Sequence, residues 1–89
     1  MQITDKAIRQ IRQLTQNNDH TEAYILVCSL VGEKGNDLKE QFEKIKSTQE
    51  REGELSFELY SHRQRLYIQL MNLIERLLGE DAKRIRQAL

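Results

Sequence analysis

The chain has 89 residues, enough for one small domain with a single core but too few for a deep active-site cleft. Its 14 basic and 14 acidic side chains balance, whereas a nucleic-acid-binding domain normally carries a basic excess. The longest apolar cluster, residues 23–31 (AYILVCSLV), falls short of the roughly 18 residues that a membrane span needs. The absence of proline and the abundance of helix-forming residues predict an all-α fold.

The first predicted helix covers residues 4–16. Thr4 can cap the free amides of its first turn, and Ile3 can pack on Ile8 as a hydrophobic staple. Apolar residues then recur at helical spacing at Ala7, Ile8, Ile11 and Leu14. The basic residues of this helix share its outer side: Lys6, Arg9 and Arg12.

The second predicted helix covers residues 19–31, with Asp19 and Glu22 at the spacing of a capping box. Its apolar residues run nearly all round the cylinder, which is typical of a helix at the centre of a bundle. Cys28 lies among them, and we expect a small buried hydrophobe. A single cysteine allows no disulfide within the chain.

The third predicted helix covers residues 36–52, capped by Asn36 or Asp37. Its apolar stripe is narrow and consists of Leu38, Phe42 and Ile45. The next nine residues (KSTQEREGE) have no apolar side chain, so the helix either projects into solvent there or frays. We interpret Gly53 as its C-terminal stop.

The fourth predicted helix, residues 56–78, is the longest, at roughly 33 Å. Leu55 and Ser56 can staple and cap its start, and Gly79 can end it. One row of leucines is expected to face the core: Leu59, Leu66, Leu70, Leu73 and Leu77. A fifth helix, residues 80–88, extends the fourth or folds back on it. Short loops favour antiparallel neighbours, so we predict a compact antiparallel bundle of four to five helices.

No catalytic grouping emerges from the sequence. His20 and His62 lie in polar stretches, and neither an HExxH nor a CxxC spacing occurs. Glu50 and Glu54 are spaced for one solvated helix side and not for a buried acid–base pair. We therefore expect a non-enzymatic protein with no metal, cofactor or small-molecule ligand. The polar N-terminus carries no signal-peptide segment, so we expect a soluble cytoplasmic protein with no membrane contact.

The sign of the charge alternates along the chain. Residues 1–16 hold three basic and one acidic side chain, residues 17–31 two acidic, residues 32–54 five basic and seven acidic, and residues 55–89 six basic and four acidic. This pattern is compatible with an ordinary solvated surface or with two complementary faces that meet head to tail between copies. Our hypothesis for those faces names the following residues: Arg9 and Arg12 on one, Glu43, Glu50, Glu52 and Glu54 on the other, with Arg63 and Arg65 as further contacts. Exposed ion pairs are weak, so apolar anchors such as Tyr24, Tyr60 or Tyr67 would be needed too.

Two stretches of the sequence resemble a known family. Residues 11–30 (IRQLTQNNDHTEAYILVCSL) and residues 36–74 (NDLKEQFEKIKSTQEREGELSFELYSHRQRLYIQLMNLI) are similar to the bacterial effector-associated domains, subtype eleven. The matching positions are Glu22, Ala23, Gly53, Leu55, Ser56, Leu66, Leu70, Leu73 and Ile74. Where that pattern has an asparagine before the first apolar position of the long helix, this chain has Gln64 or Arg65.

The resemblance implies a non-catalytic adaptor comparable to death-fold domains. Such adaptors pair with copies of the same domain and couple sensor and effector proteins in bacterial conflict and antiviral systems. Two alternatives remain open on the residues alone. One is a dimeric helical scaffold in which the fourth helix pairs with its symmetry mate. The other is a helical nucleic-acid binder that uses Arg63, Arg65 and Arg76.

Overall fold

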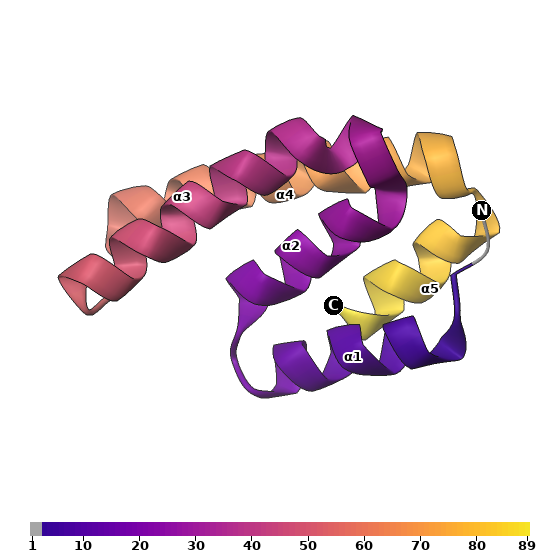
Figure 1. Ribbon diagram of the computed structural model, residues 1–89, viewed down its shortest axis with the longest axis horizontal. Helices are drawn as coiled ribbons and strands as arrows, with labels where there is room; N and C mark the ends of the chain where they lie inside the picture. The colour runs from indigo at the N-terminus through magenta and orange to yellow at the C-terminus, as the bar shows by residue number, and fades with distance from the viewer. Residues whose placement is uncertain (1–2) are drawn as a thin grey trace.

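The computed structural model describes residues 3–89, and within them it contains α-helices, one 3₁₀ turn and no strand (Figure 1). The helices are α1 (Asp5–Gln16), α2 (His20–Val31), α3 (Asn36–Glu52), α4 (Phe57–Leu78) and α5 (Glu80–Ala88), with the 3₁₀ turn η1 (Gly32–Gly35) between α2 and α3. The predicted all-α bundle of four to five helices is confirmed. Each predicted helix boundary agrees with the structure to within one residue.

α2 is the central helix, as its nearly continuous apolar sequence predicts. It contacts α1, η1, α3 and α4, and Figure 1 shows it between α1 on one side and the α3–α4 pair on the other. Ala23, Val27 and Cys28 are fully enclosed. Because three neighbouring helices bury their apolar sides against α2, the bundle has one continuous core rather than two.

Three aromatic rings join α2 to its long neighbours. The ring of Tyr24 lies 5.4 Å from that of Phe42 on α3 and 5.2 Å from that of Tyr67 on α4, both tilted. Tilted rings at this separation contribute more than their buried area alone. Tyr24 is buried, so it is a core residue and cannot serve as the surface anchor that the sequence suggested.

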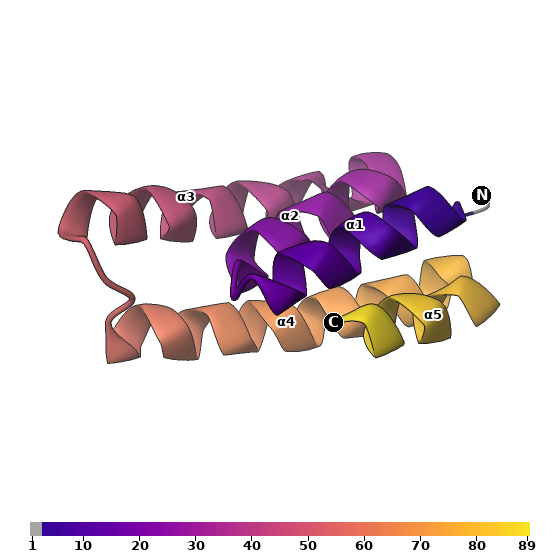
Figure 2. The same cartoon turned by 90° about the horizontal axis from the view of Figure 1, so that it is seen from below.

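α3 and α4 form an antiparallel pair whose joined ends extend past the N-terminus of α2 (Figure 2). We call this part, residues 47–60, the arm. α3 stays helical to Glu52, so it projects and does not fray. Gly53 then takes the left-handed conformation, φ +82°, and donates its amide to the carbonyl of Gln49 at 2.8 Å. Any other residue at this φ would cost about 1 kcal/mol, so the position favours glycine. The left-handed glycine and its hydrogen bond end α3 in a defined turn.

The predicted helix caps form at two of four places. Thr4 accepts from the amide of Ala7 at 3.1 Å, and Ser56 accepts from that of Leu59 at 3.2 Å. Asp19 occupies the cap position of α2 without making the bond, so the predicted capping box is wrong. The prediction of Asn36 or Asp37 as the cap of α3 is also wrong, because η1 runs directly into that helix. A continuous run of helical backbone leaves few amides for a side chain to cap.

The first and last helices of the described chain lie side by side, because α5 folds back along α4 and packs on α1 (Figure 2). Its Ala82, Ile85 and Ala88 are buried in the core. Among residues 3–89, no helix is both long and apolar enough to cross a membrane.

Candidate interaction surfaces

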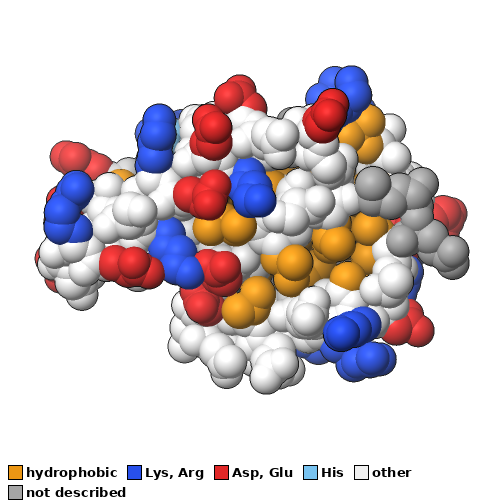
Figure 3. All heavy atoms as spheres, viewed as in Figure 1, with side chains coloured by type: hydrophobic (Ala, Val, Ile, Leu, Met, Phe, Trp, Pro, Cys, Tyr) orange, Lys and Arg blue, Asp and Glu red, His pale blue; other side chains and the backbone are white. Residues whose placement is uncertain are grey.

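The predicted basic face forms on α1. Arg9 and Arg12 are exposed one turn apart, and with Arg84 of α5 they line a hollow of about 430 Å³. Arg84 is held in place by ion pairs with Asp5 and Asp81. Arg9 and Arg12 make no ion pair within residues 3–89, and Figure 3 has basic side chains at the lower right, over α1. Both guanidinium groups are therefore available to a carboxylate of another molecule.

The predicted acidic face is only partly assembled. Glu43 and Glu50 are exposed seven residues apart, which is almost two full turns, so they share one side of α3. Glu52 lies half a turn away from Glu43, on the opposite side, and Glu54 follows the end of the helix. Figure 3 shows acidic and basic side chains mixed over α3. The structure brings together Glu43 and Glu50 and does not bring the other two to them.

A carboxylate that the sequence assigned to a helix cap instead joins two helices. Glu22 of α2 forms an ion pair and hydrogen bond with Lys46 of α3. That hydrogen bond raises the pKa of Lys46. Since both side chains are about one-third exposed, the pair is a partly solvated contact that fixes α3 against α2.

Arg63 is inside the protein, so the prediction that it contacts a partner is wrong. Only 7% of its surface is exposed. Its Nη1 donates to the hydroxyl of Thr21 at 3.0 Å, and its Cζ lies 5.9 Å from the ring centre of Tyr24 and 5.6 Å from that of Tyr60. None of the ion pairs within residues 3–89 includes Arg63, and its Nε has no hydrogen-bond partner. The nucleic-acid alternative thereby loses one of its three arginines.

Arg65, by contrast, is exposed near Tyr60, which the sequence suggested as an apolar anchor, and near Phe57 and Ile68, which it did not suggest. Phe57 is 81% exposed, Ile68 60% and Tyr60 45%. We call the side of α4 that carries these residues the outer α4 face; it comprises Phe57, Tyr60, Ser61, Gln64, Arg65 and Ile68. Leu77 is also 42% exposed, so the predicted core row of leucines ends before it. Tyr60, Ser61 and Ile68 follow Phe57 by three, four and eleven residues, and residues at these spacings lie on one side of a helix. This spacing is the sequence signal that could have placed them on a common face.

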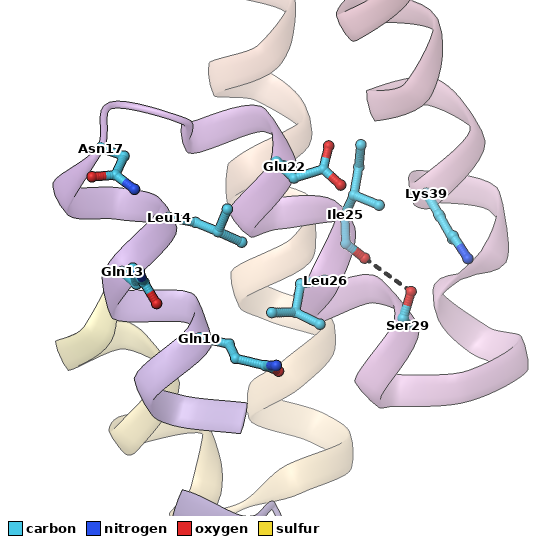
Figure 4. Close-up of a pocket in the computed structure, with 9 residues that line it drawn as sticks. All are labelled: Gln10, Gln13, Leu14, Asn17, Glu22, Ile25, Leu26, Ser29 and Lys39. Carbon is cyan, nitrogen blue, oxygen red and sulfur yellow. Dashed lines mark hydrogen bonds between the residues drawn. The ribbon is translucent and has the colours of Figure 1, made fainter. Parts of the chain in front are cut away.

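A shallow apolar depression lies between α1 and α2 (Figure 4). Its volume is about 510 Å³. In Figure 4 Leu14 of α1 and Leu26 of α2 point into the space between the two helices, with Gln10 at its edge. Ser29 donates its hydroxyl to the carbonyl of Ile25 at 3.2 Å, so it is already satisfied. The depression offers apolar surface with a rim of amides and of the charged groups of Glu22 and Lys39. The Glu22 carboxylate is already paired with Lys46.

The groups with potential for chemistry are separated. Cys28 is fully buried, and burial raises the pKa of its thiol to about 12, which keeps it in the unreactive protonated form. His20 and His62 are both half-buried, on α2 and α4. Within residues 3–89, no group of three or more His, Cys, Asp and Glu side chains could hold a metal ion.

Comparison of the chain with family models, with curated proteins and with solved structures found no match.

Proposed function

We propose that this chain is a non-catalytic adaptor domain that works by homotypic protein–protein interaction in the cytoplasm. The observation that carries the proposal is the outer α4 face, where two large apolar side chains, Phe57 and Ile68, are more than half exposed. Apolar side chains that gather on one side of a small domain are typical of a protein-binding surface. The partner would be a copy of the same domain or a related one, without nucleic acid or a small-molecule ligand.

The biological setting follows from the family resemblance. Effector-associated domains couple a sensor to an effector in bacterial conflict and antiviral defence, and we propose the same role here. The single small core supports this proposal, because the domain presents exposed helix surfaces around one core. An 89-residue domain of this kind would supply recognition, and the linked or partner protein would supply the activity.

A charged contact can supplement the apolar one. Arg9 and Arg12 on α1 are complementary to Glu43 and Glu50 on α3, and the two pairs lie on different helices. A contact between different faces is heterologous, so it adds copies head to tail. Each exposed pair would contribute at most about 1 kcal/mol, so added salt should weaken the contact.

Light scattering against protein concentration tests the proposal. We expect the average mass to rise with concentration, and the double variant R9E/R12E to reduce that rise. Adding E43K/E50K to that variant should restore it, because the charges are again opposite. The variant K34E/R76E is a matched control that makes the same change in net charge at exposed positions away from α1. Equal masses for the wild-type protein and R9E/R12E would contradict the charged contact, and a monomer at every concentration would contradict homotypic pairing.

A further inference from the structure

The exposed apolar residues of α4 lie on one side of the helix. At about 100° per residue, Phe57, Tyr60 and Ile68 fall within roughly 80° of one another. Leu66 and Leu70, which are buried in the core, project from the opposite side. Phe57 and Ile68 are thus turned away from the core, and no helix of residues 3–89 encloses either of them. The Tyr60 ring is partly exposed and also contacts the buried Arg63 guanidinium.

We propose that the outer α4 face is the docking surface for a second copy of this chain, arranged antiparallel about a twofold axis. The inference rests on the proposed homotypic function and adds the antiparallel twofold geometry of the contact. A twofold contact is isologous, so it closes into a dimer. The head-to-tail contact of α1 and α3 would use other surfaces and could join such dimers.

The charges beside the outer α4 face favour a second copy of the chain as the partner. Glu58 and Arg65 border the same edge of the outer α4 face, seven residues apart. Both are exposed, and neither makes an ion pair within residues 3–89. In an antiparallel twofold pair, each edge of α4 meets the same edge of the second copy. Glu58 of each copy therefore lies beside Arg65 of the other, and the dimer contains this ion pair twice.

The residues of the face also suit one register. If Phe57 faces Ile68 of the second copy, Ser61 faces Gln64 of the second copy, next to the twofold axis. A serine at this position allows the two helices to approach closely, and the Gln64 amide can both donate to and accept from its hydroxyl. A polar pair at the centre of an apolar contact opposes a slip of register, since a slip would leave both groups unpaired.

The rest of the molecule leaves room for this arrangement. The proposed overlap runs over residues 57–68 of each copy, about 18 Å at 1.5 Å per residue. Figure 2 shows α5 along only the C-terminal part of α4, where Arg86 pairs with Glu75. α5 of each copy therefore lies outside the overlap. Because the overlap is short, we expect a weak dimer whose population depends on concentration.

Sedimentation equilibrium of the whole chain, at concentrations up to about 1 mM, tests the surface. We expect Ile68→Glu to weaken dimer formation about tenfold or more, because a carboxylate would be buried against Phe57 of the second copy. Gln13→Glu is the matched control: it adds the same charge at an exposed position of α1, away from α4. Neither change should alter the melting temperature of the monomer by much, since both positions are exposed.

Exchange of charges tests the geometry. E58R and R65E should each weaken the dimer, because like charges then meet at the shared edge. The double variant E58R/R65E should recover it. An equimolar mixture of the two single variants should form mixed dimers in preference to either homodimer, because both ion pairs are restored between unlike copies. This last result is specific to an antiparallel contact in which Glu58 meets Arg65.

The possible outcomes separate the two proposals. Loss of the dimer in Ile68→Glu, with recovery in E58R/R65E, supports the docking surface. A dimer that survives Ile68→Glu and both charge variants, but weakens in R9E/R12E, overturns the docking surface and leaves homotypic adaptor function standing. A wild-type chain that stays monomeric up to about 1 mM overturns both.

Discussion

Arg63 is a cation in the core, and no carboxylate of residues 3–89 forms an ion pair with it. One hydroxyl and two tyrosine rings surround its guanidinium group instead. Cation–π contacts that are shielded from water contribute about 2 kcal/mol or more each, and a hydrogen bond to a charged group about 1.5–3 kcal/mol. These contacts offset the loss of hydration, and together they attach α4 to the start of α2.

We predict that Thr21→Val lowers the free energy of unfolding by about 1–3 kcal/mol, because the Arg63 Nη1 would lose its acceptor inside the protein. The same change in an Arg63→Met background should cost less, because the donor is then absent. Urea unfolding of the four proteins of this double-mutant cycle measures the coupling. Equal costs of Thr21→Val in the two backgrounds would show that the two side chains are not coupled.

Burial of Cys28 predicts a pH dependence above pH 9. Burial raises the pKa of this thiol from its ordinary value of 9.0 to about 12, so between these values the unfolded chain loses a proton that the folded chain keeps. The contribution of this thiol to the free energy of unfolding should therefore be fully present below pH 9. It should fall as the pH rises, by up to about 1.4 kcal/mol per pH unit. Cys28→Ala should lack this part of the slope in denaturant unfolding at pH 8 to 11. An unchanged slope would contradict the burial of the thiol.

The position of Arg63 could have been read from the sequence, and that of Phe57 could not. Arg63 precedes Leu66 and Leu70 by three and seven residues, so it shares their side of the helix. The charged surroundings in HRQR obscured this spacing. Phe57 and Ile68 look like further core residues of an apolar helix, because only the neighbours of α4 decide which of its apolar sides is covered.

At the scale of elements, the helices follow from periodicity and the corner at Gly53 from its residues, whereas η1 does not. The boundaries were predicted to within one residue, because glycines and polar runs separate clear helical repeats. η1 was missed, since a 3₁₀ turn of four residues has too little sequence to show a period. Its presence explains why neither Asn36 nor Asp37 caps α3.

Gly35 is the turn residue that we expect to be most sensitive to substitution. Its φ of −93° suits any residue, but a Cβ there would lie 2.4 Å from the carbonyl oxygen of Cys28. Gly53 has the opposite character: its φ is +82°, and a Cβ would meet nothing within 4 Å. We expect Gly53→Ala to lower the free energy of unfolding by about 1 kcal/mol. We predict that Gly35→Ala lowers it by more, as measured by urea unfolding. The reverse order would mean that α2 and η1 separate easily.

At the scale of the whole molecule, charges near in sequence need not share a surface. The sequence grouped four glutamates of residues 43–54 as one face, yet the helical turn places Glu52 opposite Glu43. Net charge by segment sums all sides of a helix, so it cannot identify a face. The basic hollow illustrates the same point, because Arg84 joins Arg9 and Arg12 from the far end of the chain.

The two ends of the described chain are connected by polar contacts that the sequence did not indicate. Asp81 of α5 accepts from the amide of Ile3 at 3.2 Å, and Arg84 donates to the carbonyl of Ile3 at 2.8 Å. Arg84 also pairs with Asp5 at 2.6 Å. Because these residues are about 80 positions apart, only the tertiary fold brings them together. Loss of α5 would remove both this contact and the buried side chains beneath it.

We predict that Asp81→Asn destabilises the protein at neutral pH and that this deficit shrinks in acid. The hydrogen bond from the Ile3 amide, and then that from Arg84, lower the pKa of Asp81 below its ordinary 3.8. A carboxylate with a lowered pKa stabilises the fold above the unfolded value, and this contribution disappears as the pH falls through the folded value. Thermal melting from pH 7 to pH 2 should therefore show the two proteins converging below pH 3.8. Glu80→Gln removes a neighbouring charge from the same first turn of α5. Because Glu80 makes no ion pair within residues 3–89, its difference from the wild-type protein should be smaller. A larger effect of Glu80→Gln would mean that the charge at the start of α5, and not the contact with Ile3, supports this end of the bundle.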